Sequence, residues 1–151
     1  MSVDLESSSL NRQDGASVEV IFAVLADSAN VSREGKLNIL GNFAEIYVSQ
    51  FPARHPEMQL VLRMGASPAE IGMHKKLEMQ LLDEDGGKIS GFSADFEVPE
   101  PAKPGESVDI QLITRILDTV FPKAGRYAIY VLIDGKTEAT VPLTVGQVGE
   151  G

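Results

Sequence analysis

Residues 127–145 read YAIYVLIDGKTEATVPLTV, and this stretch decides the fold class. Apolar side chains take every second position on both sides of the central pair Asp134-Gly135. A spacing of two is typical of strands that bury one face in a core. An Asp-Gly pair accepts the positive φ angles of a tight two-residue turn. The stretch therefore predicts a β-hairpin of two long strands.

The same alternation recurs along the rest of the chain. It predicts strands over residues 18–26, 37–40, 44–48, 58–63, 76–81, 88–98, 108–116, 127–133 and 138–145. The acidic turn 83–87 joins two of them, and the proline-rich stretch 99–105 predicts a longer crossover. The one helix signal is Ser67-Pro68-Ala69-Glu70, a capping box that Gly72 ends after about one turn. We therefore expect an all-β, antiparallel β-sandwich of the immunoglobulin-like, Greek-key type with eight or nine strands.

Length and composition predict one domain between two tails. The chain has 151 residues, and we assign the sandwich domain to residues 17–146. The polar stretches 1–16 and 147–151 lack periodicity, so we predict disordered tails there. The absence of cysteine excludes disulfides and thiolate metal sites and fits a reducing compartment. The N-terminus has neither the basic nor the apolar part of a secretory signal, so we expect a cytoplasmic protein.

The charge balance narrows the range of partners. The chain carries 22 acidic and 13 basic residues, a formal net charge of -9. Such a chain repels phosphate backbones and anionic lipid, so we expect neither nucleic acid nor a membrane surface as its partner. The remaining expectation is a homo-oligomer or a complex with another protein, without a cofactor.

Two pairs of segments carry a family resemblance. The first pair is EVIFAVLAD at 19–27 with GKLNILG at 35–41, and the second is FPKAGRY at 121–127 with VLIDG at 131–135. Together they resemble an uncharacterised bacterial protein family, a domain of unknown function with an immunoglobulin-like β-sandwich look, over residues 18–145. The resemblance implies a fold and a bacterial source, and it implies no activity.

The second of these segments also has a physical explanation. Pro122 pre-sets a turn, Gly125 supplies a backbone conformation that other residues resist, and Tyr127 starts the next strand. In many sandwiches a tyrosine at this place ties the corner through its hydroxyl group. We therefore predict a structural role for Tyr127.

No group of residues predicts catalysis. His55 lies in a predicted loop and His74 at a strand entrance, and neither has a serine or cysteine partner at a recognisable spacing. Asp83, Glu84 and Asp85 cluster the oxygen ligands that calcium prefers, but one such cluster rarely supplies the six to eight oxygens required. A solvated hairpin tip is the alternative interpretation of that turn.

Two predicted strands are apolar on both faces, 18–26 and 127–133. In the second strand, Ala128, Tyr130 and Leu132 point away from the core face, and we expect Ile113 to join them from a neighbouring strand. Outward positions of a sandwich are normally polar, so we expect an apolar outer face to be shielded from solvent by other residues. A loop or the N-terminal tail, a two-fold related second copy, or a different protein can provide it.

The leading hypothesis is a non-enzymatic protein-interaction or structural module that self-associates. The alternative is a ligand-binding or hydrolytic domain whose site is built by loops around His55, His74 and the turn 83–85. A pocket that unites one of these histidines with a carboxylate favours the alternative. A flat apolar face favours the module.

Overall fold

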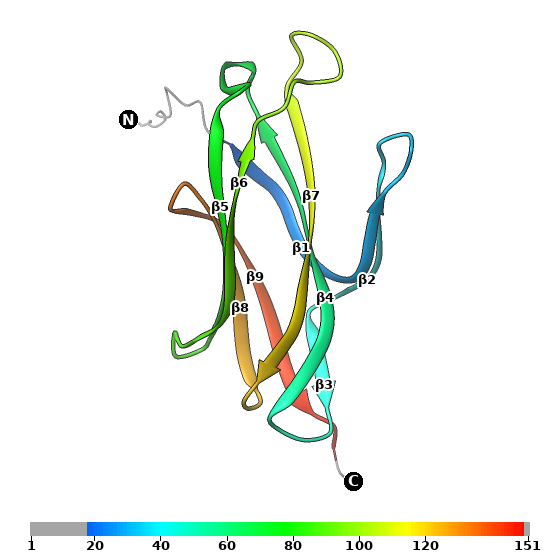
Figure 1. Ribbon diagram of the computed structural model, residues 1–151. Helices are drawn as coiled ribbons and strands as arrows, with labels where there is room; N and C mark the ends of the chain where they lie inside the picture. Colours follow the sequence, from blue (N-terminus) through cyan, green and yellow to red (C-terminus); the bar gives the residue numbers. More distant parts are fainter. Residues whose placement is uncertain (1–17, 150–151) are drawn as a thin grey trace, which may run out of the picture.

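The computed structural model describes residues 18–149 as two packed sheets (Figure 1). Their strands are β1 (Glu19–Val31), β2 (Leu37–Phe43), β3 (Glu45–Val48), β4 (Ala53–Ala66), β5 (His74–Asp83), β6 (Lys88–Glu97), β7 (Val108–Phe121), β8 (Gly125–Ile133) and β9 (Lys136–Gln147). One sheet has the order β2-β1-β4-β7 and the other β3-β9-β8-β5-β6. Only β3 and β9 pair in parallel among these strands. The predicted all-β architecture of two sheets is confirmed.

The core lies between the two sheets and follows the alternation read from the sequence. Its largest fully buried side chains are Leu25, Met58, Leu60, Leu62, Met64, Met79, Leu81, Phe121, Ile129 and Leu143. Both sheets contribute, and the contributing residues recur at every second position along β4, β5 and β8. Burial of this apolar surface is the main force that holds the two layers together.

Two predicted turns take the expected form. Asp134 and Gly135 have φ angles of 50° and 83°, and they close the hairpin between β8 and β9. The Tyr127 hydroxyl donates a hydrogen bond of 2.6 Å to the carbonyl oxygen of Lys123. The Tyr127 ring also meets Phe121 edge-on, with ring centroids 5.0 Å apart. The predicted tyrosine corner is therefore confirmed.

A bulge explains why the sequence of β1 is apolar at successive positions. A bulge between Val20 and Phe22 shifts the register of β1 against β4. As a result Ala23 and Leu25 face the core, whereas Phe22 and Val24 point to the outer face of the four-stranded sheet. An uninterrupted alternation cannot produce this arrangement.

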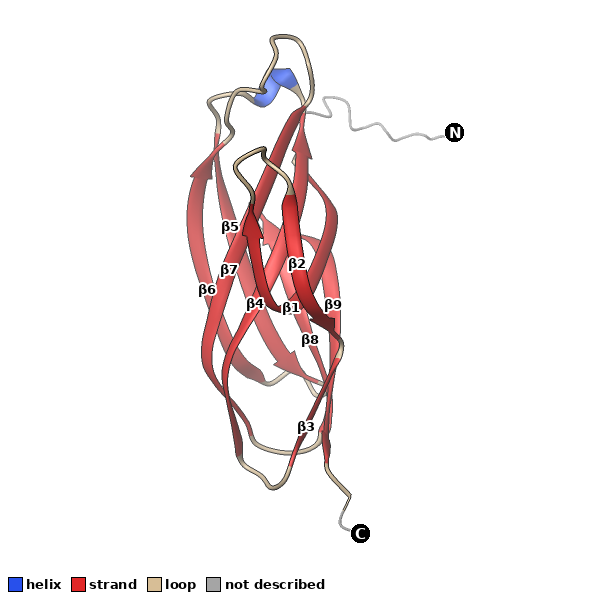
Figure 2. Ribbon diagram, turned by 90° about the vertical axis from the view of Figure 1, so that its right-hand side faces the viewer, coloured by secondary structure: helices blue, strands red, loops and turns tan. Residues whose placement is uncertain are grey.

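The hairpin of β1 and β2 leaves the plane of its sheet. The first half of β1 pairs with β4, and only the second half, from Leu25 onward, pairs with β2. Figure 1 shows the hairpin projecting from the outer side of the sheet, and Figure 2 shows it in front of β4 and β7. The outer face of the four-stranded sheet is therefore concave.

A buried ion network closes one end of the sandwich. The helix η1 (Pro68–Glu70) places Glu70, which has no exposed surface, next to the buried ammonium group of Lys75. Lys75 Nζ lies 3.4 Å from Glu70 Oε2 and 3.8 Å from Asp134 Oδ2. Glu70 Oε1 accepts the backbone N–H of Ser67, which is one half of the predicted capping box. The predicted capping box is present at the start of η1, where the Ser67 hydroxyl is buried.

Several predicted boundaries differ from the structure, because β1 continues to Val31, β2 to Phe43 and β7 to Phe121. His55 was expected in a loop, but β4 begins at Ala53 and includes it. Pro56 is tolerated in that strand because β1 pairs with β4 only from Gln59 onward, so one side of Pro56 has no strand to bond. At the other end, β9 continues to Gln147, one residue into the predicted tail 147–151. The predicted tail 1–16 lies outside the described residues.

Candidate functional site

The outer face of the five-stranded sheet carries an apolar patch. The patch consists of Leu82, Ala128, Tyr130, Leu132 and Pro142. Ala128 on β8 pairs with Leu82 on one side and with Pro142 on the other, so one row of the patch crosses three strands. Tyr130 and Leu132 are half-buried and continue the patch along β8. Three of the four interface residues expected from the sequence therefore share this face.

Ile113 is not part of the patch. It was expected beside β8, but β7 pairs with β4 and belongs to the four-stranded sheet. The connection between β7 and β8 passes from one sheet to the other, so two strands that follow each other in sequence do not lie side by side here. Ile113 instead pairs with Val61 on the opposite side of the molecule.

The concave outer face of the four-stranded sheet forms what we call the trough. Its floor is the row Val24, Val61 and Ile113, which are paired across β1, β4 and β7. Val61 has no exposed surface although it lies outside the main core, and its two neighbours are half-buried. The trough floor is therefore a small second apolar cluster, separated from the core by the sheet itself.

An ion pair borders this floor on each side. Arg63 Nε and Nη2 both donate to the Asp109 carboxylate at 2.9 Å. On the other side, Arg115 donates to both oxygens of Glu57, at 2.9 and 3.1 Å. These hydrogen bonds hold the pKa of Glu57 below its usual value. Each charge has a bidentate partner, so the pairs position β4 against β7 rather than supply a free acid or base.

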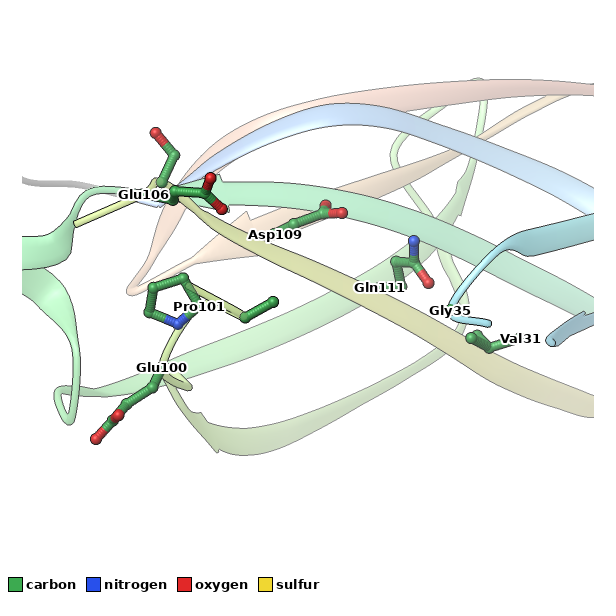
Figure 3. A pocket seen from close by; sticks show the side chains of 9 residues that line it. Val31, Gly35, Glu100, Pro101, Glu106, Asp109 and Gln111 are labelled. Carbon is green, nitrogen blue, oxygen red and sulfur yellow. The ribbon is translucent and has the colours of Figure 1, made fainter. Parts of the chain in front are cut away.

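Two adjoining cavities lie beside the β1–β2 hairpin, the larger against the crossover between β6 and β7 and the smaller against the trough. The larger has a volume of about 540 Å³, and Figure 3 shows it with Glu100 and Glu106 at one end and Val31 and Gly35 at the other. The smaller, of about 380 Å³, lies between the trough and Leu37 and Ile39 of β2. Both are lined by Gly35, Asp109 and Gln111, so they form one continuous depression.

The sequence does not reveal this depression, although it contains one signal of it. Phe22 and Val24 are apolar at positions that an ordinary sandwich gives to water. One explanation for such a position is cover by a loop or the N-terminal tail. In the structure, Phe22 lines the smaller cavity together with Leu37 and Ile39 of the neighbouring strand β2.

The structure does not bring the histidines and the acidic turn together. His74 begins β5 and Asp83 ends it, so ten residues of strand, about 30 Å at 3.3 Å per residue, separate them. His74 Nε2 lies 4.0 Å from Glu97 Oε1 and is exposed. His55 belongs to the other sheet, where its ring centroid is 6.2 Å from that of Phe43.

The carboxylates of the acidic turn bind neighbouring groups of the protein. Asp83 Oδ1 accepts the backbone N–H groups of Asp85 and Gly87, and Glu84 Oε1 accepts that of Arg126. Asp85 Oδ2 lies 3.8 Å from Lys123 Nζ. Among residues 18–149, no three histidine, aspartate or glutamate side chains are grouped so that they could hold a metal ion.

Comparisons with known proteins give a family and distant structural likenesses. A family model described as a family of unknown function, DUF6941, matches residues 21–146. No curated protein matches. One similar solved structure is the Pseudomonas fluorescens alkylpurine DNA glycosylase AlkC bound to DNA with an abasic-site analogue, at 11% identity and a TM-score of 0.46 over 87% of this chain and 31% of that one. Another is a β-glucuronidase of glycoside hydrolase family 2, at 15% identity and a TM-score of 0.37 over 69% of this chain and 11% of that one.

This chain therefore spans less than a third of either of those proteins. In the part of the chain that the structure describes, no helix has the length and apolar character needed to cross a membrane.

Proposed function

The chain belongs to DUF6941, a family of unknown function, and from its structure we propose that it is a non-enzymatic protein-interaction module that self-associates. The observation that carries the proposal is the apolar patch around Tyr130. Side chains on the outer face of a sandwich normally meet water and are polar, so an apolar row across three strands is typical of a contact surface. Two-fold homodimers are the commonest assemblies of soluble proteins.

A non-enzymatic role is supported by the positions of the titratable groups. The alternative, a ligand-binding or hydrolytic site around His55, His74 and the turn 83–85, needs these residues in one pocket. They lie in two sheets and at opposite ends of one strand. The net charge of -9 favours a protein partner over nucleic acid or a membrane surface.

The proposed self-association is tested by solution mass. Light scattering across a concentration series is expected to show a dimer that dissociates on dilution. If the patch is the contact, Tyr130→Ser and Leu132→Ser weaken the dimer, because each removes apolar surface from it. Leu117→Ser is the matched control, since Leu117 is 51% exposed on the other sheet. A monomer at every concentration refutes self-association.

We also propose that the two sheets are arranged as in the immunoglobulin fold. The strand order supports it: β4 lies between β1 and β7 in one sheet, and β8 lies between β5 and β9 in the other. The tyrosine corner at the start of β8 supports it as well. A crystal structure with a different strand order or different connections between the strands would contradict this proposal.

A second candidate function is capture of an extended segment of another protein in the trough. The continuous depression beside the hairpin favours it, because binding sites for other molecules are usually concave. To test this function, a photo-reactive phenylalanine analogue replaces Phe22, and the protein is cross-linked by light in its native host. A cross-linked second polypeptide is expected there and not from the same analogue in place of Tyr47, a 60% exposed residue of β3. Equal cross-linking at both positions contradicts this function.

A further inference from the structure

The strand β2 differs from the other edge strands of the molecule. The two sheets end in four edges, formed by β2, β7, β3 and β6. Charged side chains mark the last three: Asp109, Arg115 and Asp118 on β7, Glu45 on β3, and Lys88, Asp95 and Glu97 on β6. The seven residues of β2 read LNILGNF and contain neither a charge nor a proline. Charges and prolines are what natural sheets use to keep edges from pairing.

The same strand exposes apolar side chains to solvent. Leu40 is 73% exposed, the highest fraction of any large apolar side chain in the described residues, and its neighbour Ile39 is 37% exposed. One side of β2 pairs with β1, and the other has no strand beside it within residues 18–149. An uncharged, apolar strand with open backbone groups is the kind of surface to which another strand adds.

We propose that two copies of this chain pair through β2, antiparallel to each other, about a two-fold axis at Leu40. The two four-stranded sheets then become one sheet of eight strands. The inference rests on the proposed self-association and gives the edge of β2 as a contact surface alternative to the patch around Tyr130, and the experiments below distinguish the two surfaces.

The sequence of β2 is complementary to itself in this register. Leu40 meets Leu40 of the second copy on the axis, and Asn38 meets Asn42 of the second copy on the same face. Each amide already donates one hydrogen bond to β1, from Asn38 to Asn30 Oδ1 and from Asn42 to the carbonyl oxygen of Leu25. Each keeps a second N–H and its own carbonyl oxygen for the amide of the second copy. On the opposite face, Ile39 lies across from Gly41 of the second copy, which pairs a large side chain with the smallest residue.

The backbone also fits this register. Antiparallel residues that face each other here have numbers that sum to 80, so both are odd or both are even. Along a strand, successive residues direct their N–H and C=O groups to opposite sides. Gly41 has a φ angle of 74° and departs from this alternation, so the ladder with the second copy is made by the groups of β2 on either side of it.

The carboxylate of Asp27 is expected to weaken the proposed contact between the two copies. Asp27 on β1 lies over Gly41, with its carboxylate where a side chain of that glycine would begin. Two such carboxylates approach the axis in the dimer, and like charges repel. The isosteric change Asp27→Asn is therefore expected to lower the dimer dissociation constant, whereas Leu40→Lys is expected to raise it.

The test measures the dissociation constant of the full chain by sedimentation equilibrium. Leu40→Lys is expected to raise it at least about tenfold, since two ammonium groups then meet at an apolar strand pair. Leu117→Lys is the matched control, because it places the same charge on the exposed side of the opposite edge strand β7. Far-ultraviolet circular dichroism and thermal melting verify that each variant folds.

Hydrogen exchange identifies the surface independently of substitution. Amide protons of Leu37 to Phe43 are expected to exchange more slowly as the concentration of the wild-type chain rises through its dissociation constant. Slower exchange confined to β8, with a dimer sensitive to Tyr130→Ser and not to Leu40→Lys, overturns the β2 contact and leaves self-association standing. A wild-type chain that is monomeric throughout overturns both.

Discussion

Replacement of Lys75 by methionine gives the sharpest test of the packing described above. Lys75 is 8% exposed, and Glu70, its closest acidic partner, is 0% exposed. Methionine keeps most of the volume of the lysine stem but removes the ammonium group 3.4 Å from Glu70 Oε2. The buried carboxylate then keeps one backbone N–H donor, from Ser67, and loses its nearby cation.

The expected loss of unfolding free energy is about 3–5 kcal/mol, the usual effect of breaking a buried ion pair from one side. The double variant Glu70→Gln with Lys75→Met is expected to lose less than about 2 kcal/mol, because it leaves no unpaired buried charge. The surface variant Lys136→Met serves as the control. Its ammonium group is 3.9 Å from Glu138 and 80% exposed, so its loss is expected within about 1 kcal/mol.

Urea denaturation at pH 7 of the wild type, Lys75→Met, Glu70→Gln, their double variant and Lys136→Met measures these differences, provided that the transitions have equal slopes. The reasoning is refuted if Lys75→Met loses less than about 1 kcal/mol, or if the double variant loses the sum of the two single losses. Either outcome means that the network at the end of the sandwich does not act as a coupled unit.

Two further predictions concern the corner and the trough. Tyr127→Phe removes the hydrogen bond to Lys123 but keeps the ring, so urea denaturation is expected to show a loss of about 0.5–1.5 kcal/mol; no loss means that the corner does not contribute to stability. Arg115 lowers the pKa of Glu57 from its usual value of 4.5, so the stability from this pair is complete above that pH and is lost as the pH falls through the lowered pKa. The stability difference between wild type and Glu57→Gln, measured by thermal melting from pH 7 to pH 3, is therefore expected to shrink below pH 4.5, and a difference that stays constant contradicts the assignment.

Strands, turns and the tyrosine corner were predictable because each depends on neighbouring residues. The alternation along residues 127–133 predicts which residues of β8 face the core, and the pair Asp134-Gly135 predicts where the chain reverses. Local signals also placed Ala128, Tyr130 and Leu132 on one outer face. These predictions need no knowledge of what lies on either side of a strand.

The candidate surfaces depended on the tertiary structure instead. Alternation is the same whichever sheet a strand joins, so it could not show that Ile113 lies in the trough rather than beside β8. It could not show that a bulge at Val20 turns Phe22 outward, nor that the β1–β2 hairpin leaves its sheet to form a depression. The sequence by itself determined the strands, the turns and the alternation along each regular strand. Strand order, curvature and the approach of Lys75 to Asp134 were decided by contacts between residues far apart in the chain, which only the folded packing brings together.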